Sequence, residues 1–293
     1  MVVWRQYFTP KKNARVCSMT SREPVDIAAI RAAVANPNGP YARVDYTAFT
    51  GSTNADLVAA GHQNAPAWTA AVTEYQNSGR GRHGRVWTAP KGSQVTLSIL
   101  IRPTAESIER LGTMPLVSGL AIIDALTATA ARHPDATDKP TPQLKWPNDV
   151  LIDGRKLCGI LAEAVSLGPE PAVVIGLGLN VSITTEELPV PHATSLDLEA
   201  PGIEIDRAQL TADVLLALHH RINQWVDADP QLMADYRAVC SSIGADVKVL
   251  LPGDEELLGT VRDVADDGRL VVVDKQGSEH VLAAGDVTHL RLQ

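Results

Sequence analysis

The hydrophobic pattern of the chain changes near Ser241, and this change constrains the fold more than any other feature. After it, short apolar runs alternate with turns, at Val247–Leu251, Leu258–Val264, Leu270–Val273 and His280–Ala283. Short strands at this spacing predict a small antiparallel barrel. Before it, strand-like and helix-like segments are mixed, which predicts a domain built from both helices and strands. We therefore expect an α+β chain, in which a large domain precedes a small β domain.

Hydrophobic periodicity locates the elements of the larger part. Helices are predicted at Val25–Val34, Ala55–Ala60 and Pro115–Ala131, from Leu210 to Trp225, and from Asp229, with Pro230 at the first helical position. Strands are predicted at Tyr41–Thr50, Ala70–Gln76, Val95–Ile101, Leu144–Asp153, Leu157–Val165 and Ala172–Val181. Asp206 and Gln209 are placed like a capping box for the helix that follows them.

Charge and cysteine content exclude several classes of protein. The formal net charge is −8, and the sequence pI is about 5.5. Non-specific nucleic-acid binding needs a basic surface, which such a chain lacks. Cys17, Cys158 and Cys240 are too few and too scattered for a disulfide framework or a zinc site. We expect a cytoplasmic protein without a membrane partner, because no apolar run approaches the length of a membrane span.

The N-terminal residues 1–24 are predicted to be an unstructured extension, with Met19 as an alternative start. They are rich in basic residues, as transit peptides are. However, they show neither a cleavage signal nor a clear amphipathic helix. The first helix is therefore expected to begin near Val25.

Residues 79–87, which read GRGRHGRVW, form the most informative segment. They contain the GxGxxG pattern of dinucleotide-binding proteins, but that fingerprint opens a helix, whereas this segment leads into another strand. Its glycines let backbone N–H groups approach an anion, and Arg80, Arg82 and Arg85 carry forked donors suited to phosphate or carboxylate. In an acidic chain this predicts a specific anionic ligand. A solvated basic loop and an RGG-like nucleic-acid loop are the alternatives.

Two further segments place charge beside apolar strands. The run from Lys145 to Asp149, KWPND, puts a polar pair next to a strand, although Asn-Asp after Pro is often only a turn. Lys156 opens the apolar run that continues to Glu163. It is either a solvated residue at a strand edge or an ammonium aimed at an activated carboxyl or phosphate. Cys158 has no His near it in the sequence, which favours a small buried apolar residue over a nucleophile.

Two glycines interrupt the apolar strand Ala172–Val181. Gly176 and Gly178 are two residues apart, so they face the same side of the strand. Two missing side chains on one face weaken a strand unless something lies against it. Either a ligand or a closely packed neighbouring backbone fits that description.

In this order, these segments resemble the biotin–protein ligase family (the biotin–acetyl-CoA-carboxylase ligases). The arginine loop, KWPND, the KLxGIL strand, the GxGxNV strand and the upstream Ser52-Thr53-Asn54 all match, from roughly Tyr41 to the C terminus. The resemblance implies an α+β fold. Its catalytic domain, at residues 25–240, would be a mixed sheet flanked by helices, like that of class II synthetases and biotin–lipoyl ligases. An SH3-like β-barrel domain would follow at 241–293. It implies ATP-dependent attachment of biotin, through biotinyl-5′-AMP, to a lysine of the biotin carboxyl carrier domains of acyl-CoA and pyruvate carboxylases.

The resemblance also implies roles for individual residues. Lys156 and Arg82 would stabilise charge on the reacting phosphate, and Asp149 would orient or deprotonate the incoming lysine, so these three would be catalytic. Residues implied to bind biotin or biotinyl-AMP are Ser52, Thr53, Asn54, Gln76, Gly79, Arg80, Gly81, Arg82, Trp87, Lys156, Gly159, Gly176, Gly178 and Asn180. Mg²⁺ would arrive on the phosphates of ATP, with Asn180 near it, and no metal site made by the protein alone is expected.

Other functions remain open at this point. Some members of the family carry an N-terminal helix-turn-helix domain and repress transcription. One predicted helix before the first strand is too little for that module, so we expect the enzyme alone, without a DNA partner. A lipoate–protein ligase has a similar fold and chemistry, but the arginine loop and KWPND favour biotin. The remaining alternatives are a biotin-sensing regulator and a noncatalytic interaction protein.

Overall fold

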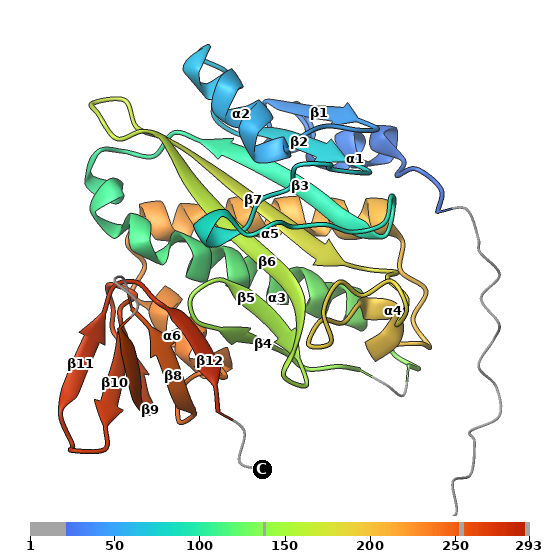
Figure 1. The fold of residues 1–293 in the computed structure, drawn as a ribbon. Helices are drawn as coiled ribbons and strands as arrows, with labels where there is room; N and C mark the ends of the chain where they lie inside the picture. The colour runs from blue at the N-terminus through green and yellow to red at the C-terminus, as the bar shows by residue number, and fades with distance from the viewer. Residues whose placement is uncertain (1–21, 137–138, 252–254, 291–293) are drawn as a thin grey trace, which may run out of the picture.

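The computed structural model describes residues 22–136, 139–251 and 255–290, so most of the predicted extension lies outside the described residues. Its last part differs from the prediction, because residues 22–24 pack onto the fold (Figure 1). Arg22 donates a hydrogen bond to the carbonyl oxygen of Ser182 (2.7 Å) and forms an ion pair with Glu187. Gly92 leaves the space for this approach, since a Cβ there would lie 2.9 Å from the Cβ of Arg22.

The larger sheet has seven strands in the order β1-β2-β3-β7-β6-β5-β4. These strands are β1 (Arg43–Thr47), β2 (Thr69–Thr73), β3 (Gln94–Ile101), β4 (Pro142–Lys145), β5 (Asp149–Ile152), β6 (Arg155–Ser166) and β7 (Ala172–Asn180). The pairing of β1 with β2 is parallel and the other pairings are antiparallel. The prediction of a mixed sheet is therefore confirmed.

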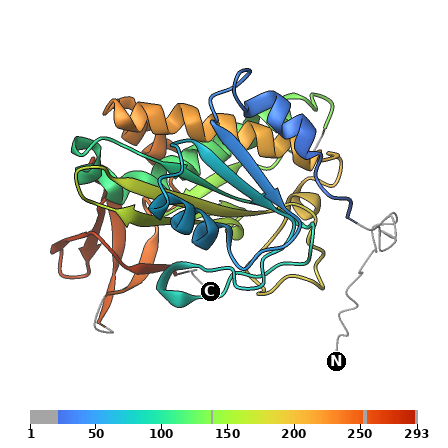
Figure 2. The ribbon, with the colours of Figure 1, turned by 90° about the horizontal axis from the view of Figure 1, so that it is seen from above.

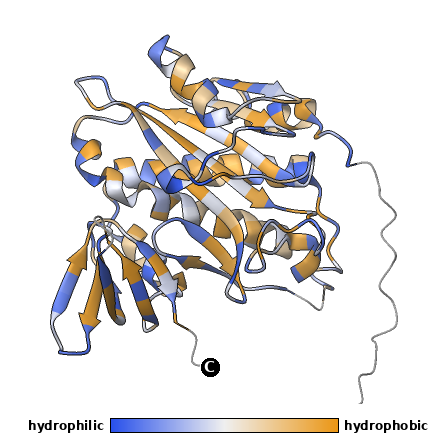
Figure 3. Cartoon of the chain, viewed as in Figure 1, coloured by the Kyte–Doolittle hydropathy of each residue, from blue (hydrophilic) through white to orange (hydrophobic). Residues whose placement is uncertain are grey.

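Helices cover both faces of this sheet, as Figure 2 shows for α5 and α2. The helices of this part are α1 (Ile27–Val34), α2 (Thr53–His62), α3 (Met114–Ala131), α4 (Leu196–Glu199), α5 (Arg207–Val226) and α6 (Gln231–Val239), with 3-10 turns η1 (Arg82–Gly84) and η2 (Glu106–Thr113). Apolar residues concentrate along the central strands (Figure 3). The long pair α3 and α5 packs on one face and leaves the opposite face, with α2, for the site.

The segment Glu106–Ala131 is long and apolar enough to cross a membrane by length and composition alone. The expectation that no segment reaches that length and hydropathy is therefore wrong. Most of its apolar window, 61%, is buried inside the fold, where α3 packs against α5 and the sheet. Core helices of globular domains meet the same criterion, so the finding is weak evidence for a membrane span.

Three local predictions differ from the structure. The expected strand Leu144–Asp153 is two strands, β4 and β5, because Pro147 has no N–H to donate to a ladder and the chain turns there. Asp206 caps α5 through its Oδ1, but the side chain of Gln209 donates to Asp213 instead of completing the capping box. Pro230 is the N-cap of α6 and not its first residue.

The C-terminal sheet has five strands in the order β11-β10-β9-β8-β12. They are β8 (Asp246–Leu250), β9 (Glu256–Val264), β10 (Leu270–Asp274), β11 (Glu279–Leu282) and β12 (Asp286–His289), all paired antiparallel. The sequence predicted the first four and missed β12. Trp146 joins the two sheets, because its indole N–H donates to the carbonyl oxygen of Gly268 (2.9 Å) and its backbone N–H donates to Ser242 Oγ.

Candidate active site

The N-terminus of α2 holds the first predicted cluster. Ser52 is the N-cap, with its hydroxyl accepting from the backbone N–H of Ala55 (3.4 Å). The backbone N–H and the hydroxyl of Thr53 both donate to Gln76 Oε1, at 2.8 and 3.1 Å. A backbone bridge between Thr50 and Gln76 holds the two segments together. The structure thus brings together three of the residues that the resemblance implies to bind biotin or biotinyl-AMP.

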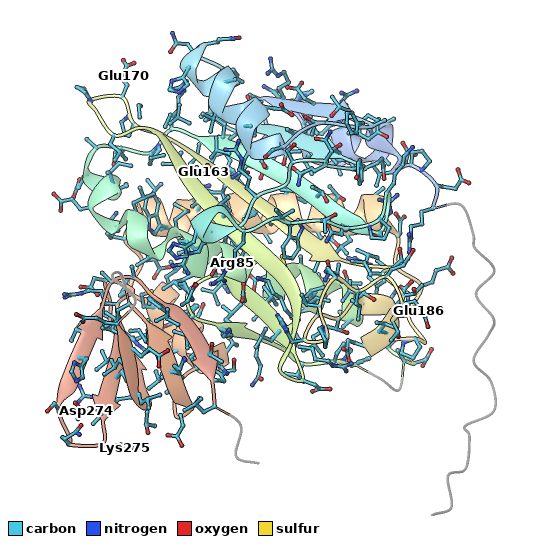
Figure 4. All side chains as sticks on the ribbon, in the orientation of Figure 1. Arg85, Glu163, Glu170, Glu186, Asp274 and Lys275 are labelled. Carbon is cyan, nitrogen blue, oxygen red and sulfur yellow. The ribbon has the colours of Figure 1, made fainter. Side chains whose placement is uncertain are left out.

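Asn54 lies deeper, between α2 and strands β6 and β7. Its Nδ2 donates to Glu163 Oε2 (2.6 Å) and its Oδ1 accepts from Ser98 (2.6 Å). Figure 4 shows Glu163 on β6 beside α2. A Cβ on Gly176 would lie 1.9 Å from Asn54 Oδ1, so this glycine makes room for the Asn54 side chain. Of the alternatives for Gly176, packing against a neighbour fits the structure, although the neighbour is a side chain and not a backbone.

The Trp87 side chain covers Gly178, the second of the two glycines in β7. A Cβ on Gly178 would lie 2.2 Å from Trp87 Nε1, and a Cβ on Gly159 would lie 3.0 Å from Trp87 Cζ3. Gly159 and Gly178 are partners across β6 and β7, so the indole lies over a pair of glycines. Its N–H donates to Gln94 Oε1 (3.2 Å). In this structure a neighbouring side chain, the Trp87 indole, therefore fills the space beside Gly178, and a ligand does not.

A hollow separates this indole from the Gln76 cluster. Its lining includes Tyr75, Gln76, Trp87, Gln94 and Thr96. It therefore combines amide and hydroxyl groups with aromatic walls. The hollow has a volume of about 10 Å³, so its walls must move apart before a flat ligand with a polar ring and an apolar edge can enter.

Lys156 and Asp149, both predicted to be catalytic, form an ion pair at 2.6 Å. The Lys156 ammonium also lies 5.3 Å from the centre of the Trp87 ring, within cation–π range. Its side chain is one-quarter exposed, so it does not extend into solvent as a strand-edge lysine would. The ammonium is therefore held beside Trp87, which is one of the residues that line the hollow.

Lys145, which the sequence reasoning passed over, belongs to the same cluster. It is the direct partner of Asp149 in the β4–β5 hairpin. Burial lowers its pKa, the nearby Lys156 charge lowers it further, and Asp149 acts in the opposite direction. The turn at Pro147 was the missed signal, because a hairpin there places the first and last residues of KWPND opposite each other.

The arginine loop forms a small hairpin of its own. Trp87 N–H donates to Gly79 O (2.9 Å) and Gly81 N–H donates to Arg85 O (2.7 Å). A Cβ on Gly79 would lie 2.4 Å from the Trp87 carbonyl oxygen, so only glycine fits there. At the tip, His83 and Gly84 have φ values of 55° and 71°, in the left-handed region.

The three arginines of this loop differ in environment. Arg80 is exposed, whereas the half-buried Arg82 donates to Asn148 Oδ1 (3.2 Å) and to the carbonyl oxygen of Gly285 (3.3 Å). Burial lowers the pKa of Arg82, and the carboxylates of Asp286 and Asp149 partly offset that effect. The Arg82 guanidinium therefore lies near the Lys156–Asp149 pair, and among the described residues no carboxylate forms an ion pair with it.

Asn180 is buried and already engaged at both ends of its amide. Its Oδ1 accepts from Gln94 (2.5 Å) and its Nδ2 donates to the carbonyl oxygen of Thr194 (2.7 Å). Within residues 22–136, 139–251 and 255–290, no group of three or more His, Cys, Asp or Glu side chains is arranged to hold a metal. Mg²⁺ is usually bound through one or two carboxylates together with substrate phosphates, so the place of Asn180 near a phosphate-bound ion stays a prediction.

Cys158 is fully buried, and burial raises the pKa of its thiol. A thiol that resists ionisation is a poor nucleophile. The structure is consistent with the packing role that the sequence favoured.

Family models match both parts of the chain. The model of the Biotin/lipoate A/B protein ligase family matches residues 46–180, and that of the Biotin protein ligase C terminal domain matches residues 242–290. The chain is 42% identical, over 92% of its length, to the biotin--[acetyl-CoA-carboxylase] ligase of Mycobacterium tuberculosis, and it covers 97% of that protein. The chain belongs to the biotin protein ligase family.

Other members of the biotin protein ligase family are more distant. The bifunctional ligase/repressor BirA of Escherichia coli is 30% identical over 69% of this chain and 61% of its own length. The fold matches the biotin protein ligase from Aquifex aeolicus in complex with biotin and ATP, with a TM-score of 0.69 and 23% identity over 86% of this chain and 100% of that one. At that identity the structural match concerns the fold alone.

Proposed function

We propose that this chain joins biotin to ATP to form biotinyl-5′-AMP and then transfers the biotinyl group to a lysine of a carrier protein. The observation that carries the proposal is the family relationship, in which a relative of nearly the same length is named as a biotin--[acetyl-CoA-carboxylase] ligase. The cluster of Lys145, Lys156 and Arg82 around Asp149 supports it, because it concentrates positive charge beside the hollow.

In the first step, a carboxylate oxygen of biotin attacks the α-phosphorus of ATP, and pyrophosphate leaves with the electrons of the broken P–O bond. Lys156 and Arg82 stabilise the negative charge of this transition state. Displacement at phosphorus depends mainly on positioning and charge stabilisation. Both cations are already oriented by neighbours, Lys156 by Asp149 and Trp87 and Arg82 by Asn148.

In the second step, the lysine amine attacks the acyl carbon, an amide forms, and AMP leaves. The amine must lose a proton, and Asp149 is the carboxylate closest to the cationic cluster. Its ion pair with Lys156 favours an orienting role, because a paired carboxylate is a weak base.

Biotin itself lies in the hollow. Ser52, Thr53 and Gln76 bind its ureido ring, while Trp87, whose indole covers Gly178, contacts the bicycle. The remaining residues proposed to bind biotin or biotinyl-AMP are Asn54, Gly79, Arg80, Gly81, Gly159, Gly176 and Asn180. Mg²⁺ would enter bound to the ATP phosphates. The carriers are the biotin carboxyl carrier domains of acyl-CoA and pyruvate carboxylases. We propose that the reaction takes place in the cytoplasm and that the chain does not bind DNA.

Mass spectrometry tests the proposal. The purified chain is incubated with MgATP, a biotin carrier domain and either biotin or lipoate, since the matching family includes both kinds of ligase. We expect a biotinyl adduct on one carrier lysine, and none when that lysine is replaced by arginine. An adduct with lipoate alone would assign the chain to the other branch.

A further inference from the structure

The tip of the arginine loop reaches the C-terminal sheet at two consecutive residues. Arg85 forms an ion pair with Asp286, the first residue of β12. His83 Nε2 lies 3.8 Å from the other carboxylate oxygen of Asp286. Arg82 donates to the carbonyl oxygen of the preceding Gly285 (3.3 Å). Figure 2 shows the teal loop beside the red C-terminal sheet, and Figure 4 places Arg85 between the two parts of the molecule.

These contacts matter because the loop has little else to fix its tip. It contains Gly79, Gly81 and Gly84, and glycine backbones have the most conformational freedom to lose. Its internal hydrogen bonds close the hairpin on itself but do not direct it toward the Lys156 cluster. Apart from the Asn148 contact, the partners of Arg82, His83 and Arg85 in the described residues come from the C-terminal sheet.

Residues 285–286 are themselves firmly placed. Gly285 is buried, and a Cβ there would lie 2.7 Å from a methyl group of Val249 and 3.3 Å from the carbonyl oxygen of Leu250. Asp286 pairs with Leu250 in the β12–β8 ladder, and the next residue, Val287, is buried in the core of the sheet. The carboxylate therefore stands on a strand that is paired with β8, and it contacts a loop that contains three glycines.

We propose that Asp286 is a positioning residue for the adenylation step. By holding Arg85 and His83 it fixes the tip of the arginine loop, so that the Arg82 guanidinium stays between Asn148 and Gly285 and faces the reacting phosphate. The C-terminal sheet thus completes an active site whose other residues come from the larger sheet. This inference rests on the proposed function.

A competing role for the same carboxylate makes the opposite prediction. If Asp286 only occupied the arginines until ATP arrived, removing its charge would strengthen ATP binding and leave the rate unchanged or faster. If it positions the loop, removing its charge slows adenylate formation at saturating substrates. Biotin affinity is unaffected, because the biotin hollow does not include the loop tip.

The test is single-turnover formation of biotinyl-AMP by the full chain, with biotin affinity measured separately by calorimetry. We expect Asp286→Asn to slow adenylation about fivefold or more, since small errors in position are costly to rate. The matched control is Glu279→Gln, which breaks the exposed ion pair of Glu279 with Arg262 in the same sheet, away from the loop. The control should match the wild type in rate, and both variants should have the same Tm.

A double-mutant cycle then asks whether Asp286 acts through Arg85. Arg85→Gln should slow adenylation like Asp286→Asn, and the double variant should be no slower than the slower single variant. Three results would each overturn the inference. The first is a double variant whose loss of rate is the product of the two single losses. The others are an Asp286→Asn rate equal to that of the control, and tighter ATP binding without a slower rate. If Asp286→Asn fails to fold, Arg85→Gln alone decides by the same rate criterion. A wild type that makes no biotinyl-AMP would instead refute the proposed function.

Discussion

Gly176 offers the sharpest test of how the site is built, because its role in the structure differs from that of Gly178. We predict that Gly176→Ala destabilises the fold in the absence of any ligand. The new Cβ would lie 1.9 Å from Asn54 Oδ1 and 2.9 Å from Ser98 Oγ. Asn54 cannot swing aside freely, because it is buried and its Nδ2 donates to Glu163 and to the carbonyl oxygen of Leu161.

The expected cost follows from these contacts. Displacing Asn54 breaks its 2.6 Å hydrogen bond from Ser98 and its 2.6 Å hydrogen bond to the Glu163 carboxylate. The first is worth about 1 kcal/mol and the second roughly 1.5–3 kcal/mol. Overpacking adds about 1–3 kcal/mol, although the contributions are not additive. We expect a loss of about 3–5 kcal/mol, which lowers Tm by roughly 6–20 °C in a domain of this size.

Chemical denaturation of the ligand-free chain measures the loss. The control is Gly168→Ala in the connection between β6 and β7, where an added Cβ meets nothing within 4 Å, and its effect should stay within about 0.5 kcal/mol. In an Asn54→Ala background the cost of Gly176→Ala should fall below about 1 kcal/mol, because the closest atom is gone. Equal stability of Gly176→Ala and Gly168→Ala would refute the reasoning. So would an equal cost of Gly176→Ala in the wild-type and Asn54→Ala backgrounds.

Three further predictions concern the site and the junction between the sheets. Lys156→Ala should slow adenylation roughly a hundredfold with little change in Tm, and a normal rate of biotinyl-AMP formation would exclude its role. Gly178→Val should displace the Trp87 indole and weaken biotin binding in a folded protein, and unchanged binding by calorimetry would assign the glycine to packing. Burial lowers the pKa of His289, so the unfolded chain binds more protons than the folded chain below about pH 6.5. The free energy of unfolding should therefore decrease as the pH is lowered through that range. His289→Gln should flatten that fall in urea midpoints measured between about pH 7.5 and 5.5, and an unchanged slope would contradict the assignment.

Local patterns predicted the parts of the fold that depend on local chemistry. The apolar run Ala172–Val181 and the helix Pro115–Ala131 match β7 and α3 almost residue for residue, because both elements are buried on most sides and therefore appear as long apolar runs in the sequence. The two-strand nature of Leu144–Asp153 was missed, since hydrophobic periodicity does not register a tight turn inside an apolar run. β12 was missed as well, because Val287 is its one buried residue.

Contacts between distant segments could not be predicted from pattern. Arg85 and Asp286 lie 201 residues apart in the sequence, and neither position carries a local signal for the other. The Asn54 side chain over Gly176 is a similar case, because the spacing of two glycines shows that space is needed but not what fills it. Motif order led to the family, and the three-dimensional fold was needed to assign each glycine its neighbour.

Retention of the adenylate is the last property that the arginine loop should control. Arg82 links the loop to Asn148 on one side and to Gly285 on the other, so Arg82→Gly removes both of these contacts and leaves Arg85 to hold the tip through Asp286. We expect slower adenylation, and also escape of biotinyl-AMP before transfer, because loop closure protects a hydrolysable mixed anhydride. Escaped adenylate would label lysines of a bystander such as serum albumin. The measurement is bystander labelling per adenylate formed, compared between the wild type and Arg82→Gly. A solvated basic loop predicts equal ratios, and equal ratios with equal protease sensitivity of the loop, with and without biotin and ATP, would exclude retention while leaving the ligase assignment intact.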